Sequence, residues 1–188
     1  FYDHDDGVRA DANVEKLATL KPVFDREFGL VTSANSSQIT DGAAWVILAS
    51  EDAVKKHQLP VLARVVDSEW AGVEPSQMGL GPAHAMWPIL KRNKLKVDDV
   101  DYWEINEAFA GQAVACIKDL GLDVAKVNVN GGAVGIGHPL AATGSRLVLT
   151  LAHELPRSNG RYGVATACIG GGQGIAMVIE SEVHNKSH

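Results

Sequence analysis

The sequence lacks the features that mark disulfide-rich, nucleic-acid-binding or membrane-spanning proteins. Its only two cysteines, Cys116 and Cys168, exclude a disulfide scaffold, favour a reducing compartment and have no zinc-ligand spacing. A formal net charge of −6 gives no electrostatic reason to expect nucleic-acid binding. No apolar run approaches the roughly 20 residues of a transmembrane helix. An anionic small ligand stays open, because backbone N–H groups and helix ends bind anions without basic side chains.

The composition is that of a soluble globular protein, with 46% hydrophobic and 21% charged residues. A chain of 188 residues suffices for one sizeable domain or for part of a larger protein. It begins at Phe1 without an initiator methionine or a signal peptide, and residues 1–40 lack a hydrophobic period strong enough for a core. We therefore expect a piece of a longer protein, whose first residues complete a domain that begins elsewhere.

Hydrophobic patterning along the chain predicts alternating strands and helices. The apolar run at 42–50 indicates a buried strand, after which Ser50 caps a helix that ends near His57. The last two apolar runs, 162–168 and 174–180, form a hairpin. This order predicts an α/β fold with a mixed, largely parallel sheet and helices on both faces. The other expected elements are a helix at 13–20, a strand at 61–67, a helix at 82–93 bent at Pro88, a strand at 100–105, a helix at 107–120, a strand at 127–130 and a helix at 140–155.

The first motif is a glycine-rich loop that ends in a histidine, Asn130-Gly-Gly-Ala-Val-Gly-Ile-Gly-His138-Pro139. Glycines allow positive φ angles and close approach to a ligand, and Pro139 suits the first position of a helix. A lone histidine before a helix is more often structural, but these neighbours favour a functional role. We expect His138 to lie between a strand's carboxyl end and a helix's amino end, where α/β sheets bind ligands.

The second motif is Asn106-Glu107-Ala108-Phe109-Ala110. Asn106 suits a helix N-cap, bonding an N–H two or three residues further on. Its amide at the end of a strand could also hold a water molecule or polarise a carbonyl. The two interpretations are compatible and both stay open.

The third motif is Cys168-Ile-Gly170-Gly171-Gly172. A cysteine at the end of an apolar strand is usually buried and inert, which is our interpretation of Cys116 within its helix. Three consecutive glycines after Cys168 change this interpretation, because a plain hairpin rarely needs so many. Their backbone N–H groups could hold an oxyanion beside the thiol.

Together, in this order and spacing, the three motifs resemble the carboxyl-terminal half of thiolases, the coenzyme A (CoA)-dependent acyltransferases. Residues 30–43, 78–82 and 127–132 also match the family, so the resemblance covers nearly the whole chain. It implies a thiolase-like fold, in which this chain supplies the second half of a duplicated, layered α-β-α-β-α architecture. Residues 1–58 are then the end of the amino-terminal half, and residues 59–188 form the carboxyl-terminal domain.

The resemblance also implies roles for individual residues. Cys168 matches the cysteine that shuttles a proton at the α-carbon, and His138 the histidine that activates the nucleophile and helps bind the thioester oxygen. Asn106 matches the residue that holds a catalytic water in that oxyanion hole, and the Gly170 N–H contributes to a second hole. Such donors would stabilise the enolate that Claisen chemistry forms. A thiol can exchange that proton if it is partly ionised. Residues matching the CoA pantetheine site are Ser37, Met78 and Phe109.

The activity implied for the parent protein is cleavage of a 3-oxoacyl-CoA by CoA into acetyl-CoA and a shortened acyl-CoA, or the reverse condensation. CoA is then a substrate, and no metal or permanently bound cofactor is implied. Ala141 stands where many thiolases have glycine, and in this respect the sequence resembles the thiolase branch of fatty-acid β-oxidation. The family is usually homodimeric or homotetrameric. The implied compartment is the cytoplasm in a bacterium, and the mitochondrial matrix or peroxisome in a eukaryote.

One departure from the family limits this prediction. Thiolases carry their nucleophilic cysteine in the amino-terminal half, and neither Cys116 nor Cys168 lies in that motif. We therefore expect the isolated chain to be inactive and to need its missing half. Two alternatives stay open. A 3-oxoacyl synthase-type condensing enzyme shares the fold but uses two histidines, or histidine and asparagine. A thiolase-like CoA- or lipid-binding module would lack catalysis.

Overall fold

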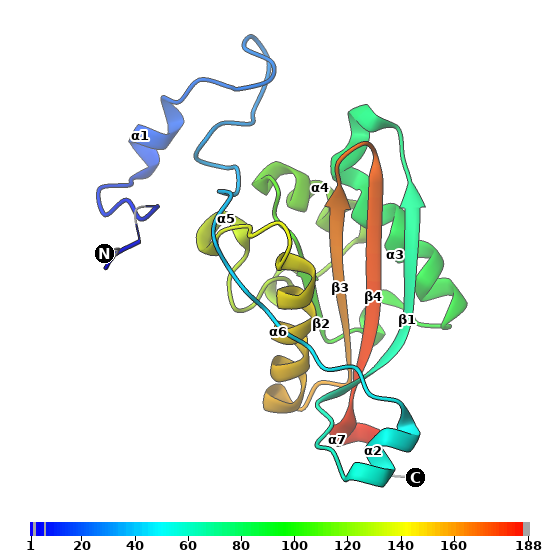
Figure 1. Cartoon of the computed structure of the whole chain (residues 1–188). Coiled ribbons are helices and arrows are strands. Elements are labelled where there is room, and N and C mark those ends of the chain that lie inside the picture. The colour runs from blue at the N-terminus through cyan, green and yellow to red at the C-terminus, as the bar shows by residue number, and fades with distance from the viewer. Residues whose placement is uncertain (2, 6, 186–188) are drawn as a thin grey trace.

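The computed structural model describes residues 1, 3–5 and 7–185, and contains a mixed four-stranded sheet. Its strands are β1 (Ala63–Gly72), β2 (Tyr102–Ile105), β3 (Tyr162–Ile169) and β4 (Gln173–Ser181), in the order β1-β4-β3-β2 (Figure 1). The hairpin β3–β4 is confirmed. Among the described strands only β2 and β3 pair in parallel, because the hairpin places β4 antiparallel between β3 and β1. The α/β class is confirmed, whereas the expectation of a largely parallel sheet is wrong.

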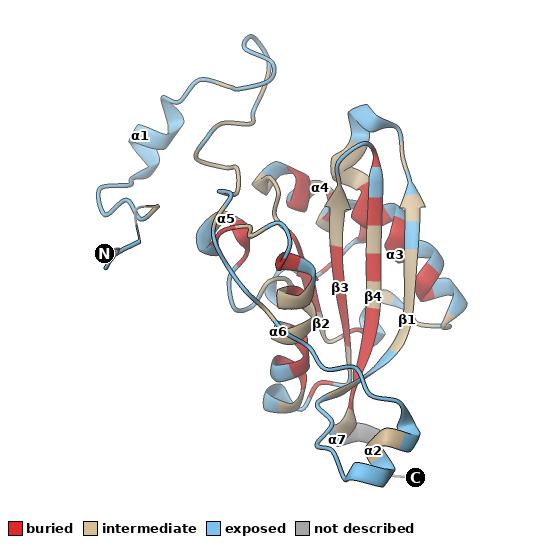
Figure 2. Cartoon of the chain, viewed as in Figure 1, coloured by how far each residue is buried: buried red, intermediate tan, exposed pale blue. Residues whose placement is uncertain are grey.

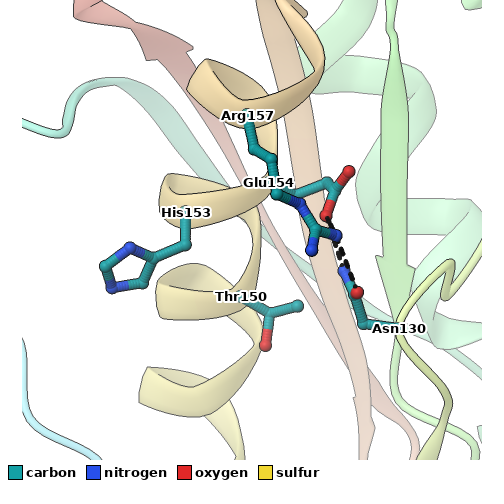
Figure 3. Close-up of a pocket in the computed structure, with 5 residues that line it drawn as sticks. All are labelled: Asn130, Thr150, His153, Glu154 and Arg157. Carbon is teal, nitrogen blue, oxygen red and sulfur yellow. Dashed lines mark hydrogen bonds and ion pairs between the residues drawn. The ribbon is translucent and has the colours of Figure 1, made fainter.

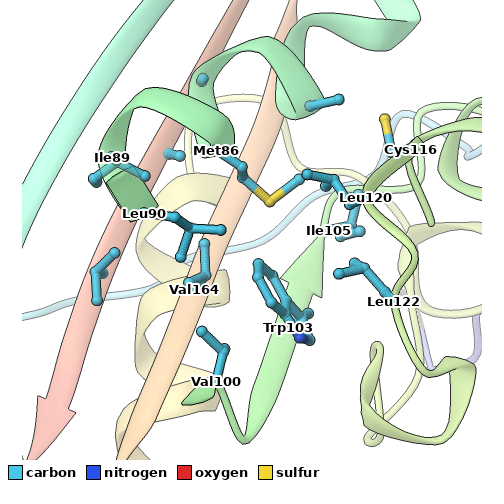
Figure 4. Close-up of a cluster of buried hydrophobic side chains, with 14 of the residues drawn as sticks. Met86, Ile89, Leu90, Val100, Trp103, Ile105, Cys116, Leu120, Leu122 and Val164 are labelled. Carbon is cyan, nitrogen blue, oxygen red and sulfur yellow. The ribbon is translucent and has the colours of Figure 1, made fainter. Parts of the chain in front are cut away.

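Helices cover both faces of this sheet, as predicted. Helices α3 (Gly81–Arg92) and α4 (Ala110–Leu120) lie on one face of the sheet and enclose the larger core against it. Helix α6 (Thr143–Ser158) packs on the opposite face of the sheet (Figures 1 and 2). The larger core surrounds Trp103 of β2 (Figure 4). The second core contains Leu147, Leu151 and Leu155 of α6, so the four-residue leucine spacing does mark the buried side. Shorter elements are α1 (Val14–Ala18), α2 (Glu51–His57), η1 (Pro75–Leu80), η2 (Val97–Asp99), η3 (Val124–Lys126), α5 (Ala133–Ile136) and α7 (Glu182–Asn185).

The segment 43–49, predicted to be a buried strand, is extended and exposed, and it forms no strand in this structure (Figure 2). Trp45 is 85% exposed and Ile47 is 93% exposed. A strand needs a neighbour that supplies both backbone partners and apolar surface, and none of the described residues does this here. The helix that follows is confirmed, since the Ser50 side chain accepts from Ala53 N at the start of α2.

Helix boundaries differ from the prediction around the motifs. The N-cap of α4 is Phe109, so the interpretation of Asn106 as an N-cap is wrong. Helix α6 begins at Thr143, so Pro139 precedes the helix rather than opening it. Helix α3 continues through Pro88 without interruption, because the His84 carbonyl that loses its partner lies on the exposed side.

The predicted strand at 127–130 is also wrong. Val127 makes a single bridge to Trp103, and Asn128 then turns the chain with φ of 48°. The Asn128 side chain replaces the missing strand ladder, because its Oδ1 accepts from Ile105 N at 2.8 Å and its Nδ2 donates to Ile105 O at 3.0 Å. One side chain thus binds the end of β2 to the start of the glycine-rich loop.

Candidate active site

The ends of two parallel strands bring Asn106 and Cys168 to the same edge of the sheet. Ile105, the last residue of β2, pairs with Thr166 of β3, and Asn106 N donates to Thr166 O at 2.9 Å. Cys168 follows Thr166 by two residues on β3. In α/β folds, ligands bind outside the carboxyl ends of parallel strands. Both residues therefore lie at the edge where a site is expected.

His138 links this edge to α6 through both nitrogens of its ring. Nε2 lies 3.3 Å from Asn106 Nδ2, and Nδ1 lies 2.7 Å from Thr143 Oγ1. The Thr143 hydroxyl donates its only proton to the Pro139 carbonyl at 3.0 Å, so it can only accept from the imidazole. His138 is therefore protonated on Nδ1, and Nε2 accepts from Asn106. Sequence reasoning missed Thr143, whose only signal is its position five residues after His138.

The surroundings of His138 favour the neutral imidazole. Burial, and secondly the positive charge of Arg146, lower the pKa of His138. A neutral ring with a lone pair on Nε2 can accept a proton, and the 3.3 Å contact with Asn106 is long enough to exchange for another donor. Asn106 is 1% exposed, and its Oδ1 is buried without a hydrogen-bond partner among the described residues. This amide can therefore hold a polar ligand atom or a water molecule beside the imidazole.

Glu107 holds the glycine-rich loop against the Asn106 motif. Its carboxylate accepts from Val134 N at 3.1 Å and from Asn128 Nδ2 at 3.0 Å. A Cβ on Gly132 would lie 2.0 Å from the Glu107 Cδ, so any other residue here would displace the Glu107 carboxylate from its two donors. The close approach at Gly132 is thus to a side chain of this protein, and the approach of these glycines to a ligand stays a prediction. Glu107 lies inside a predicted motif, although sequence reasoning assigned it no role.

The residues 35–40, which we call the strap, bring Ser37 and Phe109 together. Ser37 N and Oγ both donate to Ala108 O, at 3.0 and 3.2 Å, and Ser36 bridges to Phe109. The Phe109 ring also packs edge-to-face on Phe24, with 5.8 Å between centroids. Two of the three residues predicted to line a pantetheine site are thus neighbours at the start of α4.

The strap continues from the Asn106 motif to the His138 loop. Its Gln38 carbonyl accepts from His138 N at 2.8 Å. A Cβ on Gly137, which has φ of 92°, would lie 2.5 Å from the Thr40 side chain. The strap therefore fixes the backbone of both loops. Sequence reasoning did not predict these backbone contacts, because a polar segment rich in Ser and Asn resembles an ordinary loop.

The turn after Cys168 is shaped by its glycines. Gly171 and Gly172 have φ of 88° and 92°, and a Cβ on Gly172 would lie 2.4 Å from Val73 O. No atom lies within 4 Å of a Cβ built on Gly170, so the space beside its backbone is open. Burial raises the pKa of the half-buried Cys168 thiol. The thiol is therefore protonated at neutral pH and suited to donate a proton, in contrast to the partial ionisation considered from the sequence.

Comparison with known proteins assigns the family. Residues 59–181 match the model of the thiolase C-terminal domain, and residues 1–52 match that of the thiolase N-terminal domain. The chain belongs to the thiolase family. Thiolases are acyltransferases, and the chain is similar to the mitochondrial 3-ketoacyl-CoA thiolase of Bos taurus, at 51% identity over 94% of this chain and 44% of that protein.

Two further relatives give the same assignment. The β-ketoadipyl-CoA thiolase of Pseudomonas aeruginosa is 50% identical over 95% of this chain and 45% of its own length. The crystal structure of human mitochondrial 3-ketoacyl-CoA thiolase in complex with CoA superposes with a TM-score of 0.84, at 49% identity over 92% of this chain and 44% of that one. The thiolase fold is therefore confirmed, and this chain spans less than half the length of these relatives.

The third residue predicted for the pantetheine site, Met78, belongs to η1, and η1 contacts α4, the helix whose N-cap is Phe109. The Gly172 turn packs against Val73 and Pro75, at the start of η1. The residue after Met78, Gly79, accepts a hydrogen bond from Cys116 Sγ at 3.3 Å. Cys116 is fully buried, and burial raises its pKa, so its assignment to the core is confirmed.

A shallow pocket of about 200 Å³ lies on the outer side of α6, beside the glycine-rich loop of the thiolase motif (Figure 3). Its polar groups bind one another, since Asn130 Nδ2 donates to Glu154 Oε2 at 2.8 Å and Arg157 Nη2 donates to Asn130 Oδ1 at 3.0 Å. Among the described residues, no group of three or more His, Cys, Asp and Glu side chains could hold a metal ion. Within residues 1, 3–5 and 7–185, no helix is long and apolar enough to span a membrane.

Proposed function

We propose that this chain is the carboxyl-terminal part of a thiolase, whose complete protein cleaves a 3-oxoacyl-CoA with CoA into acetyl-CoA and a shortened acyl-CoA, or runs the reverse condensation. The observation that carries the proposal is the hydrogen-bonded chain Asn106–His138–Thr143. It holds a neutral imidazole at the sheet edge where Cys168 lies, one residue before the end of β3. Family membership supports the reaction class.

In the proposed thiolysis, Nε2 of His138 takes the thiol proton of a nucleophilic cysteine from the amino-terminal half, and the thiolate attacks the 3-oxo carbon and becomes acylated. The C2–C3 bond breaks, and its electron pair forms the enolate of acetyl-CoA. His138, now protonated on Nε2, and a water held by Asn106 donate to the negative thioester oxygen. Cys168 donates its proton to the α-carbon, and the protonated state that burial favours supports this role. The Cys168 thiolate then takes the proton of the CoA thiol, CoA attacks the acyl-cysteine to release the shortened acyl-CoA, and His138 returns its proton to the nucleophilic cysteine.

The Gly170 N–H is proposed to donate to an acyl oxygen during the acylation and deacylation steps. Ser37, Phe109 and Met78 are proposed to contact the pantetheine of CoA, which acts as substrate with no permanently bound cofactor. The contact of Ser37 with the Phe109 motif supports this for two of the three residues.

The missing half of the thiolase is proposed to cover the exposed apolar segment 43–49. Trp45, Ile47 and Leu48 are 85%, 93% and 80% exposed, which is unusual for consecutive large apolar side chains. A strand buried on both faces of a sheet has this composition. We propose that 43–49 adds a strand to the amino-terminal domain and that the domain boundary lies near residue 58. A role in β-oxidation, the homo-oligomer and the compartment named for the family stay predictions.

The test uses two preparations, this chain alone and this chain co-expressed with the amino-terminal half of a 3-ketoacyl-CoA thiolase. We expect only the co-expressed complex to consume acetoacetyl-CoA in the presence of CoA. In this complex, Cys168→Ser should abolish the turnover, whereas Cys116→Ser should not. Intact mass after incubation of the isolated chain with acetoacetyl-CoA should show no acyl adduct. Turnover or a stoichiometric adduct on the isolated chain would contradict the half-site assignment. A complex that binds CoA without turnover would indicate the non-catalytic alternative.

A further inference from the structure

A buried ion pair lies one step behind the Asn106–His138–Thr143 chain on the same two elements. Glu104 precedes Asn106 by two residues on β2, so both side chains project from the same face of the strand. Arg146 follows Thr143 by three residues on α6, so these two side chains lie on the same side of the helix. Arg146 Nη1 donates to Glu104 Oε2 at 2.9 Å. The same strand and helix are thus joined twice, once by the imidazole and once by the ion pair.

The burial of this pair gives it a strong influence on the local geometry. Glu104 is 1% exposed and Arg146 is 19% exposed. Separating the members of a buried ion pair leaves each charge uncompensated in a poorly solvated place. Any displacement of β2 from α6 that separates the two charges is therefore opposed. The imidazole, in contrast, contacts Asn106 by a single long hydrogen bond of 3.3 Å, which cannot set this spacing alone.

We propose that Glu104 and Arg146 are positioning residues for His138. Their ion pair fixes the spacing between β2 and α6, and this spacing lets the imidazole form hydrogen bonds to Asn106 and Thr143 at the same time. This inference rests on the proposed function for its catalytic meaning, since His138 is the group whose lone pair the reaction would use. Neither residue touches the reacting atoms in this arrangement. They act through the orientation and tautomer of the ring.

The electrostatics of the site agree with this arrangement. The Arg146 cation contributes to the lowered pKa of His138, in addition to burial. Burial also raises the pKa of Glu104 to about 7, against the opposing effect of Arg146, and the neighbouring carboxylates of Glu107 and Glu154 add to the rise. Loss of Arg146 would therefore remove the cation beside the imidazole and leave Glu104 among other carboxylates. Both changes favour a protonated or reoriented ring.

The experiment measures the tautomer and pKa of His138 by side-chain ¹⁵N NMR of the 188-residue chain, with His138→Asn to assign the signal. We expect Arg146→Met to shift the ring from the Nδ1–H form to a mixture of tautomers. Its pKa should rise toward the ordinary value of about 6.5. Arg146→Lys, which keeps the cation, should restore most of both properties. Arg157→Met is the matched control, because Arg157 also forms an ion pair from α6, with Glu154, but is two-thirds exposed.

A folded Arg146→Met chain with an unchanged tautomer and pKa would overturn the proposal, as would an equal change in Arg157→Met. If Arg146→Met does not fold, Glu104→Gln replaces it, since it keeps the side-chain volume and removes the negative charge of the ion pair. A wild-type tautomer in Glu104→Gln would then refute the positioning role. No step uses a thioester, so the absence of thiolysis in the reconstituted protein would refute the proposed function and leave this result valid.

Discussion

Replacement of Thr143 by valine tests the hydrogen-bonded chain at its buried end on α6. Thr143 is 2% exposed, and its hydroxyl accepts from His138 Nδ1 and donates to Pro139 O. Valine keeps the shape and the branching at Cβ but removes the hydroxyl. The Pro139 carbonyl stays satisfied, because it also accepts from Ala142 N and Thr143 N at 2.8 and 2.9 Å. The loss therefore falls on the imidazole N–H.

The expected magnitude follows from that single unpaired donor. A buried polar group left without its partner costs about 1–3 kcal/mol, so Thr143→Val should lower the free energy of unfolding by this amount. Thr150 provides a matched control on the same helix, because its hydroxyl bonds only the Arg146 carbonyl, at 2.9 Å. That carbonyl keeps its helical N–H partner, and Thr150→Val should change the free energy by about 0.5 kcal/mol or less.

The assay is urea unfolding of both variants and the wild type, followed by tryptophan fluorescence, in which Trp103 is the buried one of four tryptophans. Reconstituted with the amino-terminal half, Thr143→Val should also lose turnover, because His138 no longer has a fixed tautomer. Equal unfolding free energies for the two valine variants would refute the assignment of the Nδ1–H tautomer. So would full activity of Thr143→Val, since the hydroxyl would then have no part in orienting the ring.

Three other predictions follow from the site. Gly132→Ala should destabilise the chain by about 2–4 kcal/mol in urea, because its Cβ would meet the Glu107 carboxylate. Glu104 has a folded pKa of about 7, raised from an ordinary value of about 4.5, so its contribution to stability should be complete below about pH 4.5 and lost as the pH rises through 7. Unfolding curves across this range should be flatter for Glu104→Gln. With iodoacetamide, Cys168 should be alkylated slowly, faster above neutral pH, while Cys116 stays unmodified in the native chain, as measured by peptide mass mapping.

Each of these has a control or an outcome that decides against it. Gly135→Ala should be nearly neutral, because no atom lies within 4 Å of its Cβ, and an equal loss at both glycines would contradict the contact with Glu107. Parallel pH profiles for the wild type and Glu104→Gln would show that this carboxyl has an ordinary pKa. Alkylation of Cys116 at a rate like that of Cys168 would show that the larger core opens on the same timescale.

The sequence predicted the parts of this molecule that depend on local chemistry. Ser50 as a cap, the leucine stripe of α6 and the hairpin after Tyr162 follow from periodicity and capping, and the structure contains all three. Asn106 and Cys168 were placed at strand ends because strands precede them in the sequence, and the parallel register of β2 and β3 brings these ends together.

The rest depends on contacts between distant segments, which periodicity does not encode. Asn106 is a residue type that often caps helices. Helix α4 nevertheless begins only after Phe109, because residues 108–110 pair with the strap. The roles of Thr143 and Glu107 appear only when the loops are in place. The apolar run 43–49 has the pattern of a buried strand, and it lacks the sheet that would bury it among the described residues.

The strap joins its two loops by main-chain atoms at the decisive points. Ser37 N bonds Ala108 O, and His138 N bonds Gln38 O. Side-chain replacements at Ser37 or Gln38 leave these amides in place, so variation there can alter ligand contacts without releasing either loop. Proline is the exception at Ser37, because it removes the N–H. The side chains of the strap can therefore change among related proteins while its backbone continues to hold His138 beside Asn106.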